Sequence, residues 1–530
     1  MEGILAGIIV YLIILMAIGI WANKYTASED QYFVGGRKVS IIAAALSDKA
    51  SDFSGWLMLG YPGQAFKSGL GAFWAAIGCL FGTLADYVFV GPRLRIYSGK
   101  FRAITVPDYL EARLMDNTKL IRILGALIIL IFMTVYVSAQ YTAGGKALAQ
   151  AFNISVNEGI ILTAVVVMIY VLMGGFFAVV WTDVVQAMFM VATLVIMPIL
   201  ALNALGGFDK ATMVIASSSP THLDPFGGKT GLAAIVFAIG YASWIVGYFG
   251  QPHIVTRYMS VDDPRKLRRP GIFISGIWTI IVLWGAFFSG FIGYALFKAG
   301  IVNVTDPERI IPAMAIALMP SWLAGFVIAG ILAAIMSTAD SQLLVASSAV
   351  ARDVLHMVFG IELEEGIMVN LGRVVVVTLT ILAVYLAIKG GKIVYDIVAT
   401  AWGGLAVGFG PILLLSLWWS RVTKEAGIVG MAYGLISEVI LESKIYGWAF
   451  NPKAPGIFGA IGAKLTGVPV FFVNFFITLG VIIVVSLLTK PPKDIVEMHK
   501  TLFRKVPVKE RSMSPAENVA AFAKEIGLIS

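Results

Sequence analysis

The sequence predicts an all-α membrane protein, and three observations lead to this class: its composition, its long apolar segments and the interruption of two of them. The 530-residue chain is 59% hydrophobic and only 13% charged, with a mean hydropathy of +0.88. Soluble domains carry about 25% charged residues. The apolar segments have the length of about 20 residues that a helix needs to cross a bilayer, whereas a strand of an outer-membrane barrel needs only about 10.

The composition also excludes several classes of function. The single cysteine, Cys79, lies in an apolar segment, and the four histidines are scattered, so neither a disulfide framework nor a Cys/His metal site is expected. The net charge of +8 is the one feature that would suit nucleic acid. In a membrane protein, Lys and Arg in cytoplasmic loops account for it, so no nucleic-acid partner is expected.

Thirteen apolar segments predict membrane-spanning helices. The first is too long for the core of a signal peptide and is expected to be retained. Basic residues gather in alternate loops, which predicts an outside N-terminus and a cytoplasmic C-terminus. Residues 1–490 are expected to form a single transmembrane domain, and residues 491–530 a cytoplasmic tail with an amphipathic stretch near 516–526. The predicted spans are 3–22, 39–65, 71–91, 121–150, 158–177, 183–205, 230–256, 271–298, 322–349, 370–389, 395–420, 426–445 and 468–489.

The second span carries polar residues and a glycine at its centre, from Ala50 to Trp56 (Ala-Ser-Asp-Phe-Ser-Gly-Trp). Irregular backbone at this depth is tolerated only where it lines a cavity within the protein. Asp52 costs at least ~2.5 kcal/mol to insert, so such an acid indicates a functional site. The alternative is a Ser/Gly surface for close helix packing, with Asp52 paired to a neighbour.

The seventh span is interrupted as well, by three glycines and a proline between Gly240 and Pro252. The two interrupted spans lie five spans apart, which is the spacing of two inverted five-helix repeats at about 39–205 and 230–420. Paired interruptions at matching positions indicate the binding site of a transporter.

The ninth span places Ala334, Ser337, Thr338 and Ser341 at i, i+3, i+4 and i+7, on one helical face. Two adjacent hydroxyls offer neutral oxygen ligands for a sodium ion, and the carbonyls freed at the break in the second span can complete its shell. In the alternative, both hydroxyls bond to the carbonyl one turn earlier.

Further candidates have two interpretations each. Trp244 and Tyr248 stand four residues apart and can hold a compact organic cation by cation–π attraction, or can be ordinary core aromatics. Asp183 opens the sixth span and either caps its helix or lies on the path of an ion. Asp340 lies beside the hydroxyl face of the ninth span. Asp48 and Lys49 flank the break in the second span and are given no role.

Several motifs together resemble the sodium/solute symporter family, and its proline-transporting branch in particular, over residues 5 to 490. The segment from Ala401 to Gly404, followed by Phe409-Gly410-Pro411, is also similar to that branch. The other motifs are Ala-Ser-Asp-Phe-Ser-Gly-Trp at 50–56, Trp-Thr-Asp-x-x-Gln at 181–186, Gly-Tyr-Phe-Gly-Gln-Pro-His at 247–253 and Met-Ser-Thr-x-x-Ser-Gln-Leu-Leu at 336–344.

The resemblance implies a five-plus-five inverted-repeat core similar to the leucine transporter, with extra helices at both ends. It implies a sodium site made by the carbonyls of Ala50, Phe53 and Ala334 and the hydroxyls of Ser337 and Thr338. It also implies two further sets of residues. These are Asp52, Asp183, Asp340 and Ser341 for sodium coupling or a second sodium ion, and Ser54, Trp56, Tyr136, Trp244, Tyr248 and Pro252 for the substrate.

The expected function is sodium-coupled import of a small amino acid, first of all L-proline, by a multi-pass protein of the cytoplasmic membrane. The expected partners are sodium ions, the substrate and the lipid bilayer. Alternatives are the same mechanism with another amino acid or a monocarboxylate, a sensor built on a transporter domain, or a channel. An enzyme is not expected, because the chain has neither a nucleophile–base set nor a phosphate-binding loop.

Overall fold

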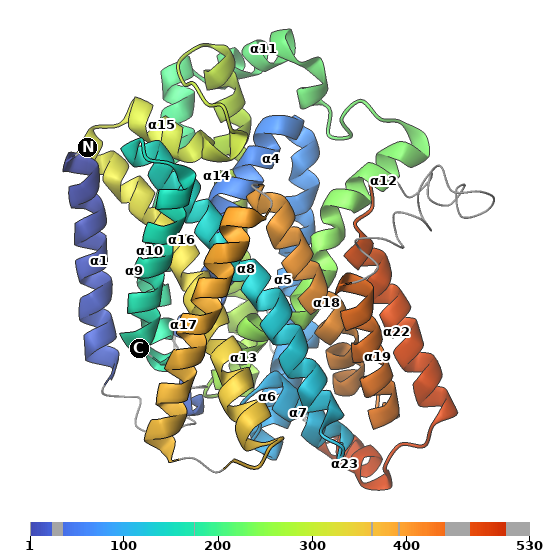
Figure 1. Ribbon diagram of the computed structural model, residues 1–530. Helices are drawn as coiled ribbons and strands as arrows, with labels where there is room; N and C mark the ends of the chain where they lie inside the picture. The colour runs from blue at the N-terminus through green and yellow to red at the C-terminus, as the bar shows by residue number, and fades with distance from the viewer. Residues whose placement is uncertain are drawn as a thin grey trace, which may run out of the picture.

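The computed structural model describes residues 2–23, 35–173, 175–361, 364–390, 393–439 and 467–504. These residues form a bundle of helices, and a parallel bridge between Val39 and Val261 is their only β pairing (Figure 1). Within the described ranges, ten helices are long and apolar enough to cross a membrane. Over its described residues, each predicted span coincides with one or more helices, so the helical membrane class is confirmed. The amphipathic stretch expected near 516–526 lies outside the described residues.

The main elements follow the chain in this order: α1 (Glu2–Asn23), α3 (Ile41–Asp52), η2 (Trp56–Gly60), α4 (Tyr61–Ser68), α5 (Phe73–Phe89), α6 (Gly91–Phe101), α7 (Val106–Leu114), α8 (Leu120–Phe152), α9 (Val156–Met173), α10 (Phe176–Leu205), α11 (Phe208–Ser218), α12 (Gly231–Ala242), η5 (Ser243–Gly250), α13 (Pro252–Ser260), α14 (Arg269–Lys298), α15 (Ile310–Leu318), α16 (Ser321–Ser348), η8 (Ala349–His356), α17 (Glu365–Lys389), α18 (Val394–Trp418), α19 (Lys424–Ile436), α22 (Val470–Leu488) and α23 (Lys493–Arg504).

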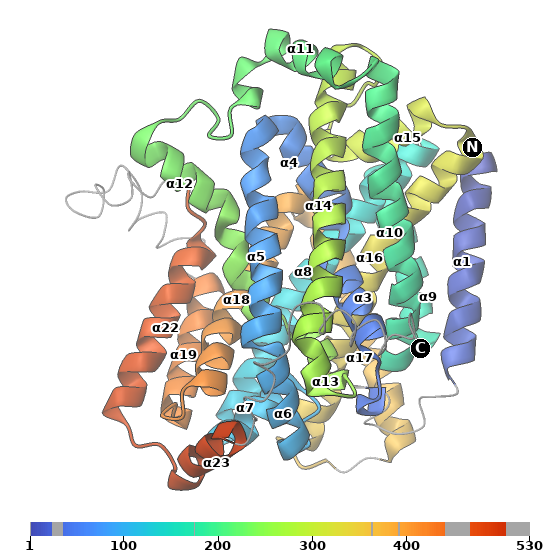
Figure 2. The same ribbon diagram turned by 180° about the vertical axis from the view of Figure 1, so that it is seen from behind.

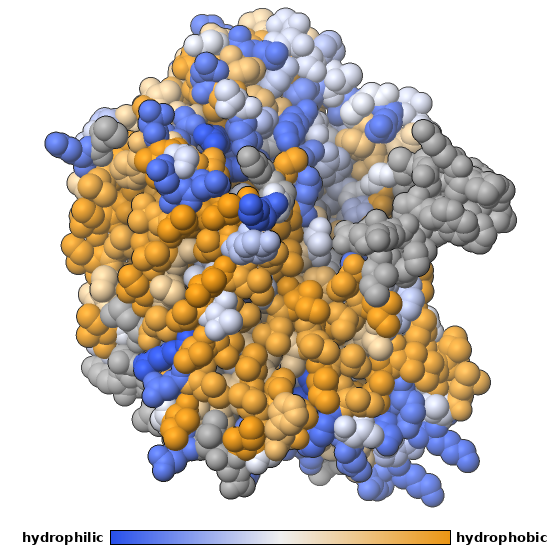
Figure 3. Space-filling model, viewed as in Figure 1, coloured by the Kyte–Doolittle hydropathy of each residue, from blue (hydrophilic) through white to orange (hydrophobic). Residues whose placement is uncertain are grey.

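The bundle has two polar ends, which we name after the helices found there. The α11 end holds α11 and α15, and the α7 end holds α6, α7 and α23 (Figures 1 and 2). Between them a broad apolar belt covers the visible face (Figure 3). Its exposed side chains include Ile381 on α17 and Leu488 on α22. Such a belt is the surface that a lipid bilayer covers.

The predicted interruption of the second span is confirmed. Helix α3 stops at Asp52 because Phe53 leaves the helical region, with φ −91° and ψ 61°. The backbone amides freed by the break find side-chain acceptors. The amide of Gly55 donates to Oε1 of Gln140 at 2.8 Å, and that of Trp56 donates to Oγ of Ser54 at 3.1 Å. The chain then continues through the π-turn η2 into α4.

The seventh span is also broken, and its proline starts a helix. After α12 the chain tightens into the 3₁₀ segment η5, and Gln251 is extended, with φ −91° and ψ 102°. Pro252 occupies the first turn of α13, where its missing amide proton has no helical partner to lose. The side chain of Gln251 donates to the carbonyl oxygens of Gly247 and Trp402, both at 3.1 Å.

Helix α16 is the central element. It packs against α1, α8, α10 and α3, and its residues from Val327 to Leu344 are buried. An apolar helix surrounded by others carries polar side chains only where neighbours satisfy them. Its Ser-Thr pair therefore faces protein oxygens, and the nearest ones belong to the broken end of α3.

Candidate functional site

Carbonyl oxygens from two helices meet the paired hydroxyls of α16. The hydroxyl of Ser337 donates to the carbonyl oxygen of Ala50 at 2.8 Å, and that of Thr338 to the carbonyl oxygen of Ser51 at 3.0 Å. Both also bond to the carbonyl oxygen of Ala334, at 3.2 and 3.1 Å. Each hydroxyl bonds back along α16, as the alternative interpretation predicts, and also bonds across to α3.

Four of the five predicted sodium ligands thus lie together: Ala50, Ala334, Ser337 and Thr338. The fifth, Phe53, is the residue at which α3 ends, and its ring stacks on Trp278 at 5.7 Å. The set offers neutral oxygens alone, from backbone and hydroxyl groups. Unwound carbonyls and hydroxyls of this kind suit a small monovalent cation.

Asp52 carries its own basic partner. Its Oδ2 lies 2.8 Å from Nζ of Lys49, one helical turn earlier, and the same ammonium lies 3.4 Å from Oδ2 of Asp48. Lys49 also donates to the hydroxyl of Thr83 on α5 at 3.3 Å. All three charged side chains are buried. The Asp48–Lys49 pair, to which the sequence assigns no role, is therefore part of the site.

A second group of polar residues surrounds Asp183 on α10. Its Oδ2 accepts hydrogen bonds from the hydroxyls of Ser47 at 2.6 Å and Ser51 at 3.1 Å. Ser51 is in turn 2.9 Å from the hydroxyl of Ser341, which donates to Oδ1 of Asp340 at 3.1 Å. The structure therefore brings Asp183, Asp340 and Ser341 together, as the resemblance implies, and Asp183 does not serve as a helix cap at the membrane surface.

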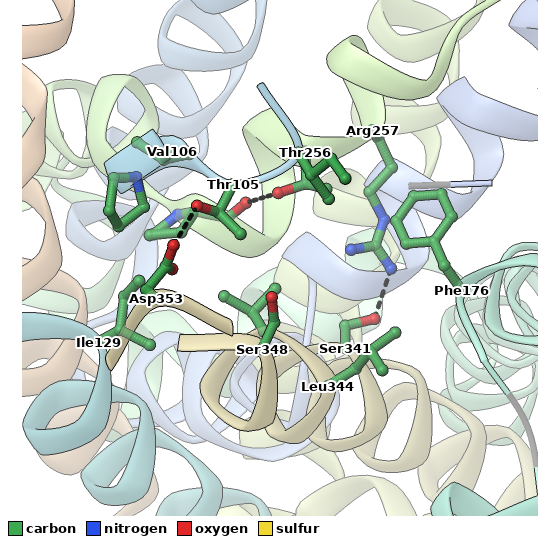
Figure 4. A pocket seen from close by; sticks show the side chains of 14 residues that line it. Thr105, Val106, Ile129, Phe176, Thr256, Arg257, Ser341, Leu344, Ser348 and Asp353 are labelled. Carbon is green, nitrogen blue, oxygen red and sulfur yellow. Dashed lines mark hydrogen bonds between the residues drawn. The ribbon is translucent and has the colours of Figure 1, made fainter. Parts of the chain in front are cut away.

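Arg257 on α13 occupies the centre of this group. Its Nη2 donates to Ser341 at 2.5 Å, to Ser51 at 2.8 Å and to Asp183 at 3.2 Å. Figure 4 shows the guanidinium pointing toward Ser341. The predicted seventh span ends at residue 256, which places Arg257 among the charges of a loop, and this prediction is wrong, since the residue is only 1% exposed. Helix α13 continues past Pro252 and carries the side chain back into the bundle.

The Asp183 group retains unsatisfied oxygens despite this guanidinium. Oδ1 of Asp183 and Oδ2 of Asp340 are buried and have no hydrogen-bond partner among the described residues. One guanidinium balances the charge of only one of the two buried carboxylates, so one further positive charge would neutralise the group. The group can therefore take up a cation in addition to Arg257.

The predicted substrate residues form an aromatic layer beside the two breaks. The ring of Trp56 lies 4.8 Å from that of Trp244, and Tyr248 meets Trp402 edge-on at 5.0 Å. Ser54 precedes Trp56 at the first break. On the other side, Tyr136 packs edge-on against His253 at 5.9 Å, next to Pro252 at the second break.

Two aromatic residues of this layer were missed as site residues. Tyr395 accepts a hydrogen bond from Nε1 of Trp244 at 3.1 Å, and Nε1 of Trp402 donates to the carbonyl oxygen of Trp244 at 3.3 Å. The sequence signal for Trp402 was its place in the motif Ala-Trp-Gly-Gly. Nothing local marks Tyr395, which lies one residue inside the start of α18.

Cavities of very different size approach this layer from the two ends. On the side of the α11 end, a cavity of about 590 Å³ is lined by Gln64, Tyr241, Trp244, Tyr395 and other residues. Toward the α7 end, a pocket of about 20 Å³ lies between Arg257, Ser341 and Asp353, with Asp353 facing Thr105 (Figure 4). Among the described residues, the space toward the α11 end is therefore much larger than the space toward the α7 end.

A network of ion pairs closes the α7 end. Arg122, at the start of α8, pairs with Asp108 on α7 at 2.8 Å, with Asp353 in η8 at 2.6 Å and with Glu111. The hydroxyl of Thr105 also donates to Asp353, at 3.0 Å. One guanidinium thereby ties α7 and η8 to α8.

The charge of Asp108 is stabilised within this network. Burial alone would raise the pKa of its carboxyl, but Arg122, Arg352 and the backbone amide of Ile104 outweigh burial and hold the pKa below its ordinary value. A depressed carboxyl pKa contributes stability above the ordinary pKa, and this contribution is lost as the pH falls through the lowered value. The Asp108–Arg122 pair therefore stays charged throughout the neutral range.

Gly247→Ala is expected to destabilise the protein, because a Cβ at this position would lie 1.5 Å from Nε1 of Trp402. The indole cannot easily retreat, since it is bonded to Trp244 and packed against Tyr248. We expect the free energy of unfolding to fall by about 1–3 kcal/mol, the usual cost of overpacking, as measured by thermal unfolding of the purified protein. Gly480→Ala on α22, where a Cβ would meet no atom within 4 Å, is the control. Equal unfolding temperatures of the two variants would contradict this packing.

Comparison with solved structures shows which fold the chain has. A Na⁺-coupled sialic acid symporter in a substrate-bound outward-open state matches with a TM-score of 0.74 at 20% identity, covering 93% of this chain and 99% of that one. Mhp1, a nucleobase-cation-symport-1 family transporter, matches with a TM-score of 0.55 at 13% identity, over 89% and 98% of the two chains. The chain shares the fold of these transporters, as the sequence predicts.

Comparison with other sequences identifies the family. The osmoregulated proline transporter OpuE of Bacillus subtilis (strain 168) is 36% identical over 484 residues, which cover 91% of this chain and 94% of the relative. A sodium/proline symporter of Escherichia coli (strain K12) is 36% identical over 464 residues, which cover 86% and 90%. The model of the sodium:solute symporter family matches residues 32–434. On these grounds, and with the transporter fold, the chain belongs to the sodium:solute symporter family.

Proposed function

We propose that this protein imports L-proline across the cytoplasmic membrane and couples this import to the entry of sodium ions. The observation that carries the proposal is the cluster of neutral oxygens between the break of α3 and the Ser337–Thr338 pair of α16. A cluster without a carboxylate suits a cation that must bind and leave in every cycle. The proline-transporting relatives, which align over most of the chain, support the choice of substrate.

Sodium is proposed to bind to the carbonyls of Ala50, Phe53 and Ala334 and to the hydroxyls of Ser337 and Thr338. These hydroxyls now donate to the carbonyls, and they would turn their lone pairs to the ion once it enters. The Asp183 group, with Asp340 and Ser341, is proposed to serve coupling or a second cation, because two of its buried carboxylate oxygens have no hydrogen-bond partner in the described part of the chain.

The substrate is proposed to bind against the aromatic layer. The faces of Trp244 and Tyr248 suit the ammonium and the apolar ring of proline, and the cavity of about 590 Å³ reaches Trp244 from the α11 end. Trp56 and Tyr136 complete the walls of this site. Ser54 and Pro252 lie at the two breaks, where non-helical backbone borders the proposed substrate site.

We assign the α11 end to the outside and the α7 end to the cytoplasm. The basic residues Arg93, Arg95 and Arg113 belong to α6 and α7, and positive charge favours the cytoplasmic side. Helix α1 begins at the α11 end and α23 lies at the α7 end (Figure 1), which supports an outside N-terminus and a cytoplasmic tail. We also propose that residues 1–490 form one transporter domain whose inverted repeats span about 39–205 and 230–420.

The decisive test is uptake of labelled amino acids into proteoliposomes that contain the purified protein. We expect saturable accumulation of L-proline with an inward sodium gradient and none when choline replaces sodium. An excess of unlabelled proline should compete, whereas alanine, glycine and lactate should not. If another solute is accumulated under sodium and proline is not, the mechanism stands and the substrate is different. If sodium has no effect on any uptake, the proposal is wrong.

A further inference from the structure

Lys49 is a buried cation at the centre of a membrane protein. Its ammonium lies 2.8 Å from Asp52 and 3.4 Å from Asp48, and none of its side chain is exposed. It also lies over the rings of Phe53 and Tyr248, with its Nζ 5.5 and 5.4 Å from their centroids. Two carboxylates and two aromatic faces thus stabilise the charged ammonium against the cost of burial.

The neighbours of the pair fix its geometry. Oδ2 of Asp48, the oxygen that lies 3.4 Å from Nζ of Lys49, also accepts a hydrogen bond from the hydroxyl of Tyr87 at 2.8 Å, which fixes its position. Two other titratable groups face this cluster from neighbouring helices, Asp86 on α5 and Arg257 on α13. The ammonium therefore has a defined position, and Asp52 is the carboxylate that it contacts most closely.

These charges belong to the same helical turn as the proposed sodium ligands. Lys49 directly precedes Ala50, and Asp52 directly precedes Phe53. Coulomb interactions between groups this close remain strong because the site is buried and poorly screened. A positive charge on this turn opposes the entry of sodium, and it also occupies the carboxylate that would otherwise attract the ion.

We infer that Lys49 is an internal counter-ion that competes with sodium for Asp52 and thereby sets the sodium affinity of the carrier. The inference rests on the proposed function and adds a residue that determines the strength of ion coupling. In the present state, sodium meets neutral oxygens beside a carboxylate that is already neutralised. The ion binds more weakly than it would if Asp52 were free, so that it can be released into the cytoplasm.

The test uses a variant that removes Lys49 without changing the total charge. Asp48→Asn/Lys49→Met deletes one acid and one base, and it leaves Asp52 without its ammonium. We expect the sodium concentration that gives half of the maximal stabilisation or uptake to fall about tenfold or more. A tenfold change corresponds to the weakest coupling energies measured between close, desolvated charge pairs. If the methionine variant does not fold, Asp48→Asn/Lys49→Gln retains a hydrogen-bond donor for Asp52 and is expected to shift in the same direction.

Two matched variants separate the competition from a general disturbance. Asp48→Asn alone leaves the Lys49–Asp52 pair and takes one carboxylate from the ammonium, so sodium should bind more weakly than to the wild type. Adding Asp52→Asn to the charge-neutral double variant should abolish its gain, because the gain requires a free carboxylate. Tighter or unchanged sodium binding in Asp48→Asn would overturn the inference.

Sodium binding is measured without substrate, as the rise in unfolding temperature of the purified protein when sodium replaces choline at constant ionic strength. The sodium dependence of proline uptake provides a second measurement. If the wild type shows neither effect, the proposed function fails. If the wild type shows both effects and the charge-neutral double variant gives the same sodium curve, Lys49 has no such role and the proposed function stands.

Discussion

The double variant Ser337→Ala/Thr338→Ala should lose sodium-driven proline uptake at ordinary sodium concentrations and recover part of it only at much higher ones. Both hydroxyls belong to the proposed ion shell and contact the carbonyls of Ala50 and Ser51 across the break. Hydrogen-bonding partners of a charged group contribute about 1.5–3 kcal/mol each. We therefore expect the apparent sodium affinity to fall at least about 100-fold.

The helix itself should survive this change, since alanine has the higher helix propensity. Ser347→Ala is the matched control, because Ser347 lies on the same helix, is buried, and bonds to the carbonyl oxygen of Leu344 within α16. Its sodium activation curve should match that of the wild type. A well-folded double variant with an unchanged sodium curve would show that the ion binds elsewhere.

Arg257→Met is expected to produce the largest loss of stability. It removes the guanidinium that bonds to Asp183, Ser51 and Ser341 and leaves the buried Asp183 without its ion-pair partner. Removing one member of a buried ion pair costs about 3–5 kcal/mol. Thermal unfolding of the purified protein should show this loss, and the amount of protein in the membrane should fall with it.

The second change Asp183→Asn separates the structural role of this pair from its role in coupling. The variant Asp183→Asn/Arg257→Met has neither charge, and we expect its stability to return to within about 1 kcal/mol of the wild type. Sodium-driven uptake should not return, since Asp183 is proposed to serve the ion. Arg265→Met, on the exposed surface with a side chain that is 82% exposed, is the control for losing an arginine. Full uptake by the double variant would mean that Asp183 does no more than neutralise Arg257.

The features that could be predicted from the sequence are those with a local cause. The interruption at Phe53 follows from polar residues and glycine in a span that is otherwise apolar. The position of the Ser337–Thr338 pair follows from helical periodicity and from the fact that a buried helix directs hydroxyls to acceptors. Both features could be inferred without knowing which helices are neighbours. The only assumption about packing was that the two interrupted spans belong to paired repeats.

The features that could not be predicted depend on contacts between distant segments. Arg257 was counted as a loop charge because the rule for orientation uses residues near the ends of spans, and it does not reveal that α13 continues the bundle. Lys49 stands three residues before Asp52, and this spacing permits an ion pair on one helical face. Whether the ammonium of Lys49 contacts Asp52 or water depends on burial by α5, which the sequence alone does not reveal. The contact of Gly247 with Trp402 joins residues 155 positions apart (402 − 247).

The ion network around Arg122 has a consequence for how the protein responds to temperature. If the site opens at the α7 end by separation of α7 and η8 from α8, the carboxylates of Asp108, Glu111 and Asp353 must exchange the guanidinium for water. The hydration of ions becomes less favourable as the temperature rises, and separated charges therefore become harder to stabilise. We therefore expect warming to shift the conformational equilibrium toward the state in which these ion pairs are formed. Opening of the α7 end should then take a larger share of the time of each transport cycle at high temperature.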